Sequence, residues 1–175
     1  MGPTLYTDRL QLREWKIDDA DAALRIYGDP EVMHFLGDGK PVVDLAAQQQ
    51  WLAERIERYR GPEFKGLGPW AIVQRDTKEV VGTMLLKQLP PTSDQIEIGW
   101  HLARRVWGCG FASEAARVVL QYGFIDLSLE RIFAVIKPGN LRSAAVARRI
   151  GMQWIERTNR YYGGEELDLF VADRE

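Results

Sequence analysis

Cysteine and histidine are scarce in this chain, which contains one cysteine and two histidines among 175 residues. A single cysteine permits no internal disulfide, which is typical of a protein kept in a reducing compartment such as the cytoplasm. A metal site needs several converging ligands, and two distant histidines with one cysteine do not provide them. We therefore expect a cytoplasmic protein with no metal centre.

Long apolar runs are also missing. No stretch approaches the roughly 20 apolar residues that a membrane-spanning helix needs, and the N-terminal residues lack the apolar core of a signal peptide. The contents of 46% hydrophobic and 27% charged residues are normal for a soluble globular protein. A chain of 175 residues suits one domain, so we expect a single unit over residues 1–175 that binds no membrane.

The net charge of −2 gives no excess of positive charge, which argues against a general nucleic-acid binder. The charge is nevertheless uneven. Residues 101–150 carry eight basic and three acidic residues, a net charge of +5, whereas the remainder carries fifteen basic and twenty-two acidic residues, a net charge of −7. A local positive field on an otherwise acidic chain suits a small polyanion. The alternative is a solvated helix face whose arginines are incidental.

One stretch predicts a strand, a glycine loop and a helix in succession. Apolar and polar residues alternate over residues 95–102, as in a strand, and apolar residues recur at steps of three and four from Ala112 to Leu127, as on one helix face. Gly108 and Gly110 lie between them and allow positive φ angles and close approach to a ligand. The unpaired N–H groups of a helix start can hold a phosphate, although a simple turn could also require glycine.

The familiar phosphate loops fit this stretch poorly. The nucleotide P-loop needs Gly-Lys-Ser/Thr, which occurs nowhere in the chain. The dinucleotide fingerprint needs a third glycine, where this chain has Ser113, and an acidic residue that ends a second strand. Asp126 and Glu130 lie within or just past the helix, so they do not meet that requirement.

The loop does match the Gln/Arg-x-x-Gly-x-Gly/Ala signature of GNAT acyltransferases, as residues 105–110. Further pieces resemble the RimJ/RimL-like branch of these N-acetyltransferases, in the same order and over nearly the whole chain. They are Thr7–Arg13, Asp29–Gly37, Val80–Gly82, Glu97–Gly99, Asn140–Ser143 and Ile150–Met152. The resemblance implies a mixed α+β fold, with a central twisted mixed sheet of about six to seven strands flanked by about four to five helices.

Local patterns predict the elements of such a fold. We expect strands over residues 5–14, 70–74, 80–87, 95–102, 131–137, 152–160 and 165–172. We expect helices after Asp18 or Asp19 as far as residue 28, over residues 31–36 as a short helix or turn, over 45–60 behind Asp44, over 112–127, and over 141–150 behind Asn140. Two strand–helix–strand units predict a partly parallel sheet, and the hairpins make it mixed.

The resemblance implies acetyl-CoA as the acetyl donor and a primary amine that attacks the thioester directly. The diphosphate would rest on the loop backbone, the pantetheine arm would lie along a splayed strand 95–102, and an N–H group near Trp100 would face the thioester oxygen. The cofactor-binding residues so implied are Trp100, His101, Leu102, Arg105, Val106, Gly108, Cys109, Gly110, Phe111, Ala112, Asn140 and Ser143.

Glu97 is the predicted general base, acting through water, because it matches the glutamate of the family's Glu-Ile-Gly strand. The alternative is a structural carboxylate, with Asp168 and Glu166 as further candidates for the base. Holding two reactants in line supplies about 7–11 kcal/mol, and acid–base groups add roughly 3–5 kcal/mol. Positioning of the reactants therefore supplies more of the rate acceleration than acid–base groups do. By analogy with the family, His101 is expected to contribute its backbone to the cofactor, although a histidine side chain can titrate near neutral pH.

Many GNAT proteins place a tyrosine, the usual acid, seven residues after the position of Asn140, where this chain has Ala147. Ser143 could instead orient or relay a proton to the leaving sulfur, or water could serve. Cys109 beside a helix start could have a lowered pKa, but direct transfer in the family disfavours an acyl-cysteine.

Trp15, His34, Phe35 and Trp70 are predicted by analogy to line the acceptor pocket, with ordinary core or surface as the alternative. The sequence leaves the acceptor open among a protein N-terminal amine, a polyamine or amino acid, and an aminoglycoside-like amine. It also leaves open a non-catalytic acyl-CoA-binding module, favoured by the missing tyrosine, and an unrelated phosphate-ligand enzyme. The family resemblance allows a homodimer.

Overall fold

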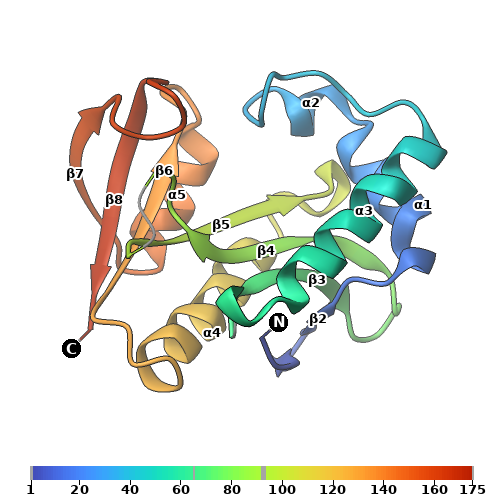
Figure 1. The fold of residues 1–175 in the computed structure, drawn as a ribbon, viewed down its shortest axis with the longest axis horizontal. Helices are drawn as coiled ribbons and strands as arrows, with labels where there is room; N and C mark the ends of the chain where they lie inside the picture. The colour runs from blue at the N-terminus through green and yellow to red at the C-terminus, as the bar shows by residue number, and fades with distance from the viewer. Residues whose placement is uncertain (1, 65, 92–93, 175) are drawn as a thin grey trace.

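A single sheet forms the centre of the protein in the computed structural model, which describes residues 2–64, 66–91 and 94–174 (Figure 1). In this described part the sheet has eight strands in the order β1-β2-β3-β4-β5-β6-β8-β7. Their bounds are Leu5–Tyr6 (β1), Leu10–Glu14 (β2), Gly68–Gln74 (β3), Val80–Gln88 (β4), Ile96–Leu102 (β5), Arg131–Ile136 (β6), Gln153–Thr158 (β7) and Leu167–Asp173 (β8).

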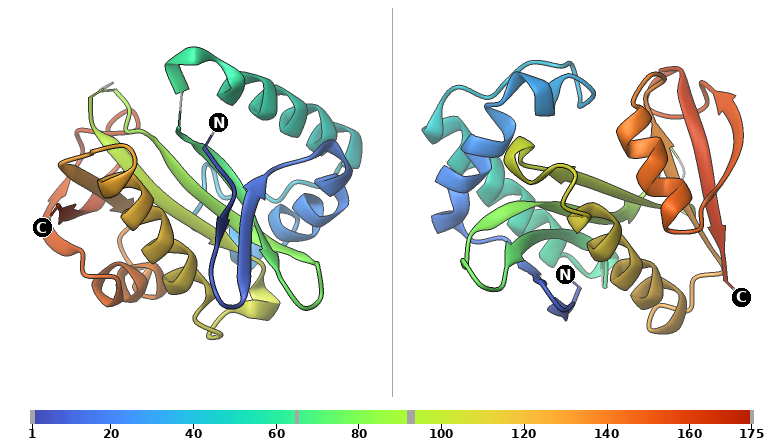
Figure 2. Two further views of the ribbon diagram at one scale, coloured as in Figure 1. Left: turned by 90° about the horizontal axis from the view of Figure 1, so that it is seen from below. Right: turned by 180° about the vertical axis from the view of Figure 1, so that it is seen from behind.

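Over the same described ranges, five α-helices surround this sheet. They are Ala20–Tyr27 (α1), Pro30–Met33 (α2), Leu45–Arg60 (α3), Phe111–Ile125 (α4) and Leu141–Arg149 (α5). Helices α1 and α3 pack together on one face, whereas α4 and α5 lie on the other (Figure 2). This confirms the mixed α+β fold that the family resemblance implies, with one strand more than expected.

The additional strand arises near the N-terminus, where we predicted one strand over residues 5–14. Thr7 instead closes a tight turn, because its N–H donates to the Leu10 carbonyl and its hydroxyl accepts from the Leu10 N–H, each at 2.9 Å. Residues Leu5–Tyr6 and Leu10–Glu14 therefore pair with each other as an antiparallel hairpin. Apolar alternation alone did not reveal this reversal of the chain.

The predicted caps of α3 and α5 are confirmed, whereas Asp19 occupies the predicted N-cap position of α1 without a capping hydrogen bond from its side chain. The Asp44 carboxylate accepts from the N–H groups of Ala46 and Ala47, and the Asn140 side chain accepts from the Ser143 N–H. The Asp19 carboxylate instead turns back to the Lys16 N–H and to the Arg13 guanidinium, at 2.8 and 2.7 Å. It therefore stabilises the short 3₁₀ turn Ile17–Asp19 that precedes α1.

The core lies between the central strands and the helices on both faces. Its fully buried side chains include Leu10, Leu12, Ile26, Leu52, Trp70, Ile72, Met84, Leu86, Ile98, Ile132 and Phe170. Helix α4 fits closely against the sheet because Ala115, Ala116 and Val119 present small, fully buried side chains on one face. Within the described ranges, no helix combines the length and apolar character required to cross a membrane.

The sheet separates at its centre, between β5 and β6. On one side, β5 pairs with β4 along its whole length, from Gly82 opposite Leu102 to Gln88 opposite Ile96. On the other side, the described residues of β5 and β6 form only one pair, Glu97 with Phe133, which is also the only parallel pair recorded in the sheet. Beyond it the two strands run apart (Figure 1), which agrees with the splayed strand 95–102 that the family resemblance implied.

Gly82 lets β4 and β5 approach closely, and we expect an alanine there to destabilise the sheet. A Cβ atom at this position would lie 2.4 Å from the backbone oxygen of His101, so the strands would have to shift. Overpacking of this kind costs about 1–3 kcal/mol, which urea denaturation of Gly82→Ala should reveal as a lower midpoint. Gly99→Ala is the control, because its Cβ atom would meet a flexible side chain of Leu85 at 3.4 Å. Equal losses of stability in the two variants would contradict the explanation.

Candidate active site

Two cavities meet where β5 and β6 diverge. The larger cavity, of about 560 Å³, lies between α2, the loop before α4, and α5. The smaller cavity, of about 220 Å³, is bounded by β5, β6 and the segment that joins β7 to β8. Both cavities are lined by Phe35, Leu36, Trp100, His101, Asn140 and Ser143. The site is therefore one passage with two ends.

The glycine loop presents unpaired N–H groups to the larger cavity. Gly108 and Gly110 have φ angles of 80° and 82°, which a residue with a Cβ atom rarely adopts. Helix α4 begins directly afterwards, and its first internal bond joins the Glu114 N–H to the Gly110 carbonyl. Among the described residues, no partner is recorded for the N–H groups of Gly108, Gly110, Phe111 and Ala112. Such a set is suited to an anion.

The predicted cradle begins later than expected. The N–H groups of Val106, Trp107 and Cys109 donate to carbonyls within the turn, at 3.0, 3.1 and 3.3 Å. Arg105, which we predicted to bind the cofactor, forms an ion pair with Glu79 at 3.2 Å and lines neither cavity. A 3₁₀ turn over Arg104–Val106 causes this difference, because it satisfies the first amides internally.

The free edge of β5 presents backbone groups to the gap. At the ends of β5, Gln95 accepts from Leu89 and Ala103 donates to Val81, so the odd-numbered residues bond to β4. Backbone groups alternate in direction along a strand, so those of Trp100 and Leu102 point away from β4, toward the divergence. The Leu102 carbonyl accepts from the Trp107 indole at 2.9 Å. The Trp100 N–H and carbonyl remain beside the passage, as the resemblance implied.

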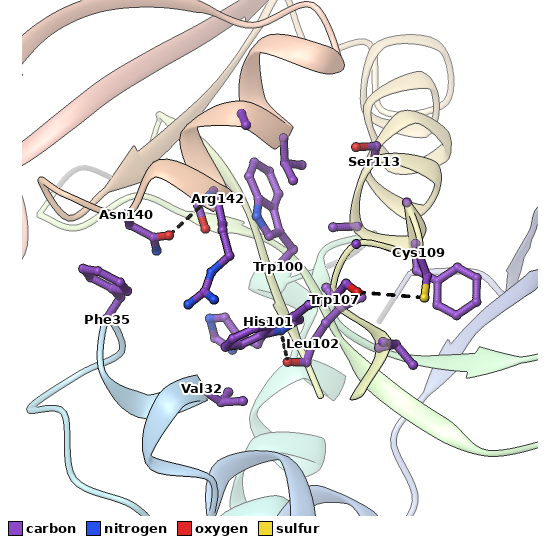
Figure 3. Close-up of a pocket in the computed structure, with 18 of the residues that line it drawn as sticks. Val32, Phe35, Trp100, His101, Leu102, Trp107, Cys109, Ser113, Asn140 and Arg142 are labelled. Carbon is purple, nitrogen blue, oxygen red and sulfur yellow. Dashed lines mark hydrogen bonds between the residues drawn. The ribbon is translucent and has the colours of Figure 1, made fainter. Parts of the chain in front are cut away.

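Two arginines of α5 supply positive charge to the larger cavity. The Arg142 guanidinium lies 3.8 Å from the centre of the Trp107 ring, and Figure 3 shows both side chains entering the same space. Arg149 donates to the Ser113 hydroxyl at 3.2 Å. None of these four residues was predicted individually, although both arginines belong to the basic stretch 101–150 that signalled an anionic ligand.

Glu97 lies at the fork, where its buried carboxylate contacts the partly exposed side chains of Lys87 and Tyr162. The Tyr162 hydroxyl donates to the Glu97 carboxylate and accepts from the Lys87 ammonium, which lies 3.3 Å from the same carboxylate oxygen. Glu97 is only 7% exposed. Burial raises the pKa of its carboxyl, and the Lys87 charge and the Tyr162 hydrogen bond only partly oppose this effect. Burial and the Glu97 charge also raise the pKa of Tyr162, so its hydroxyl keeps its proton.

Sequence reasoning missed both partners of Glu97. Lys87 lies opposite Glu97 on the neighbouring strand β4, a register that a strand prediction leaves undefined. Tyr162 occupies a left-handed turn position, with φ of 49°, between β7 and β8. Its distance of 65 residues along the chain from Glu97 gave no local signal.

His101 lines both cavities but stays neutral. Its Nδ1 atom lies 3.2 Å from the Tyr27 hydroxyl, which in turn contacts the Thr83 hydroxyl at 2.6 Å. Burial, reinforced by the charges of Arg55 and Lys87, lowers the pKa of His101 to about 3. A neutral imidazole with so low a pKa is a poor base, in agreement with the minor role that we expected.

The start of α5 brings Asn140 and Ser143 to the junction of the two cavities. The Asn140 side chain accepts from the Ser143 N–H at 3.2 Å, which fixes the first helical turn. Ala147 is fully buried in the core and provides no hydroxyl. Cys109 is exposed and lines the larger cavity.

Only one of the four predicted acceptor-pocket residues, Phe35, lines these cavities. Trp70 is fully buried, with its indole donating to the Pro3 carbonyl at 2.7 Å, and Trp15 is packed in the core. The exposed His34 packs against Phe35 but lines neither cavity. The analogy with the family therefore does not place Trp15 and Trp70 correctly, because large aromatic side chains also fill cores.

The further candidates for the base are also remote. Asp168 forms an ion pair with Arg157 at 3.0 Å, and Glu166 lies 3.7 Å from the same arginine. Neither carboxylate lines the two cavities.

Lys137 bonds to residues from two different segments that line the smaller cavity. The Lys137 ammonium, at the end of β6, donates to the Gly37 carbonyl at 2.8 Å. It also forms an ion pair with Glu165 at 2.8 Å. The loop after α2 and the segment between β7 and β8 are thereby joined through residues that line this cavity.

Comparison with known proteins agrees with this geometry. The family model described as an acetyltransferase (GNAT) domain matches residues 9–153. The chain belongs to the GNAT acetyltransferase family. An uncharacterized N-acetyltransferase, p20, of Bacillus licheniformis is 33% identical over 151 residues, which cover 86% of this chain and 82% of p20. The protein is thus an acyltransferase of the N-acetyltransferase type.

Solved GNAT structures share the fold over nearly the full chain. An acetyltransferase from Agrobacterium tumefaciens is 28% identical, with a TM-score of 0.79, covering 99% of this chain and 96% of that one. RimL, an acetyltransferase of ribosomal protein L7/L12 solved with coenzyme A, is 16% identical, with a TM-score of 0.80 and 98% of each chain covered. These structures show that the fold of this chain is that of solved GNAT proteins.

We expect His101 to make this GNAT protein less stable as the pH falls. The folded-state pKa of about 3 lies below the ordinary value of 6.5, so between these values the unfolded chain binds a proton that the folded protein does not. The free energy of unfolding should fall by up to about 1.4 kcal/mol per pH unit in this window. Urea denaturation at pH 7.5 and 5.5 should show a smaller fall for His101→Gln than for the unchanged protein. Identical pH dependences would exclude this contribution.

Proposed function

We propose that the protein transfers an acetyl group from acetyl-CoA to a primary amine in a ternary complex. The observation that carries this proposal is the passage at the fork of β5 and β6, with unpaired amides at one end and a buried carboxylate at the other. The two reactants would enter from opposite ends and meet at Trp100. RimL, which has the same fold, was solved in complex with coenzyme A, and this supports the proposed donor.

The larger cavity fits the donor. The N–H groups of Gly108, Gly110, Phe111 and Ala112 would hold the diphosphate, and Arg142 would add a full charge nearby. The free edge of β5 would bind the pantetheine arm as an added strand. The Trp100 N–H is then available to the thioester oxygen, where negative charge develops during attack.

The smaller cavity fits an amine and the removal of its proton. The amine nitrogen bonds to the thioester carbon, the carbon–sulfur bond breaks, and the sulfur leaves as a thiolate that takes up a proton from water. Glu97 would accept the excess proton from the attacking amine through water, and Ser143 at the junction would donate a hydrogen bond to the leaving sulfur. Lys87 and Tyr162 would keep Glu97 ionised despite its burial.

The acceptor is limited by space at the fork. A volume of about 220 Å³ suits a group of roughly amino-acid size, so a chain end or a small amine would enter with the rest of the molecule outside. A protein N-terminus, a polyamine or amino acid, and one amine of an aminoglycoside all provide such a group.

A panel of amines assayed by thiol release tests the proposed transfer directly. We expect coenzyme A to raise the melting temperature, ATP and NAD to leave it unchanged, and at least one amine to release thiol from acetyl-CoA. Binding of coenzyme A without thiol release for any amine would favour the non-catalytic module. Stabilisation by ATP or NAD but not by coenzyme A would contradict the proposed donor.

The pH profile of kcat tests Glu97 as the base. Glu97→Gln should lower kcat by about 10²–10⁴-fold. Activity needs the ionised carboxylate, and both the Lys87 charge and the Tyr162 hydrogen bond favour ionisation. Lys87→Met and Tyr162→Phe should therefore move the acid limb of kcat to higher pH.

Asp168→Asn is the matched control for these variants, because Asp168 is a carboxylate of the same half of the sheet that lies outside both cavities. Its kcat and its acid limb should stay unchanged. A fully active Glu97→Gln enzyme, or acid limbs that do not move in the other two variants, would refute the assignment.

A further inference from the structure

The turn between β1 and β2 contacts the glycine loop from outside the larger cavity. The Arg9 guanidinium donates to the Cys109 carbonyl at 3.0 Å and lies 4.7 Å from the centre of the Phe111 ring. Its Nη2 atom would lie 3.5 Å from a Cβ atom placed on Gly110. Arg9 does not line the larger cavity, so any effect on a ligand must pass through the loop.

Glu114, in the first turn of α4, holds Arg9 in this position. The carboxylate accepts from the Arg9 side chain at 2.7 Å and from the Arg9 backbone N–H at 3.0 Å. The Thr7 hydroxyl donates to the same carboxylate. Although partial burial disfavours the charge, these hydrogen bonds lower the pKa of Glu114. The β1–β2 turn and the start of α4 are thus joined by several charge-assisted contacts.

The contact with Cys109 determines which way one peptide group points. A trans peptide is planar, with its carbonyl and its N–H directed to opposite sides. The Cys109 carbonyl and the Gly110 N–H belong to one such unit. Because Arg9 holds the carbonyl on the outer side, the Gly110 N–H is directed toward the cavity. Gly110, on one side of this peptide, has a φ angle of 82° and no Cβ atom, so it would otherwise let the peptide rotate at low cost.

We propose that Arg9 is a positioning residue for the anion cradle, which it preorganises by fixing the Cys109–Gly110 peptide. This inference rests on the proposed use of acetyl-CoA. Without Arg9, the loop would have to order this peptide on binding, and the affinity for a diphosphate would fall accordingly.

Arg75 provides a matched control on the same turn. Its guanidinium donates to the Thr7 and Asp8 carbonyls at 2.8 and 3.1 Å. No contact between Arg75 and the glycine loop or Glu114 is recorded among the described residues. Arg75→Met therefore removes a comparable arginine that supports the hairpin and leaves the loop intact.

The experiment compares Arg9→Met with Arg75→Met for two donors, acetyl-CoA and S-acetylpantetheine, which lacks the diphosphate. Arg9→Met should raise the dissociation constant of coenzyme A and the KM for acetyl-CoA by about tenfold, equivalent to one charge-assisted hydrogen bond. Its kcat and its KM for S-acetylpantetheine should stay within twofold. Arg75→Met should lower the melting temperature without changing either KM.

A second measurement reports on the orientation of the Cys109–Gly110 peptide in the ligand-free protein. The Gly110 amide resonance should shift, and its hydrogen exchange should accelerate, in Arg9→Met but not in Arg75→Met. Arg9→Lys keeps the charge but cannot donate to Cys109 and Glu114 with the same planar set of N–H groups. Its KM for acetyl-CoA should therefore lie between that of the unchanged protein and that of Arg9→Met. This milder variant tests the proposal if Arg9→Met does not fold.

Three outcomes would overturn the positioning role. The first is an affinity of Arg9→Met for coenzyme A that equals that of the unchanged protein. The second is an equal rise in the KM of Arg9→Met for the two donors, and the third is an equal effect of Arg9→Met and Arg75→Met on these constants. Failure of the proposed function is distinguishable, because the unchanged protein would then not bind coenzyme A at all. The Gly110 amide measurement needs no ligand and would still decide whether Arg9 fixes the peptide.

Discussion

The divergence of β5 from β6 beyond the pair Glu97–Phe133 is the constraint on which the rest of the site depends. Unpaired backbone groups are costly when they are removed from water. Here they are retained beside an open passage, while the other edge of β5 stays fully paired with β4. The strand is thus rigid and still offers hydrogen bonds to a ligand. A sheet with uninterrupted pairing would close this passage.

Two ionisable residues on β5 show how position along a strand separates chemical roles. Glu97, at the fork, has a raised pKa from burial, but a lysine and a tyrosine hydroxyl limit that effect. His101, four residues further, has no counter-charge, and burial with neighbouring cations keeps it neutral. Both line the smaller cavity. The strand thus holds one carboxyl group whose charge two partners support and one imidazole that contributes polarity without charge.

Local chemistry was sufficient to predict much of the fold. The glycine loop, the cap residues Asp44 and Asn140, and the strand around Glu97 all have causes within a few residues of sequence. The turn at Thr7 was not predicted, because it lies inside an apolar pattern and is held by a side-chain hydrogen bond that takes the place of a backbone bond. Trp15 and Trp70 were misplaced since residue type does not distinguish a pocket wall from a core.

The parts of the site that sequence did not predict come from long-range pairing. Lys87 reaches Glu97 through strand register, and Tyr162 reaches it from the far hairpin. Arg142 and Trp107 meet only because α5 packs beside α4. The charge balance of residues 101–150 indicated an anionic ligand but could not identify which arginines face it.

The contacts made by Lys137 have a mechanical consequence for the lining of the smaller cavity. The Lys137 ammonium joins the Gly37 carbonyl to the Glu165 carboxylate, and all three residues line that cavity. Moving the loop after α2 away from the segment between β7 and β8 would therefore break a hydrogen bond and an ion pair together. This part of the lining is held by polar contacts that can break and form again, whereas the strands beneath it are fixed by the pairing of the sheet.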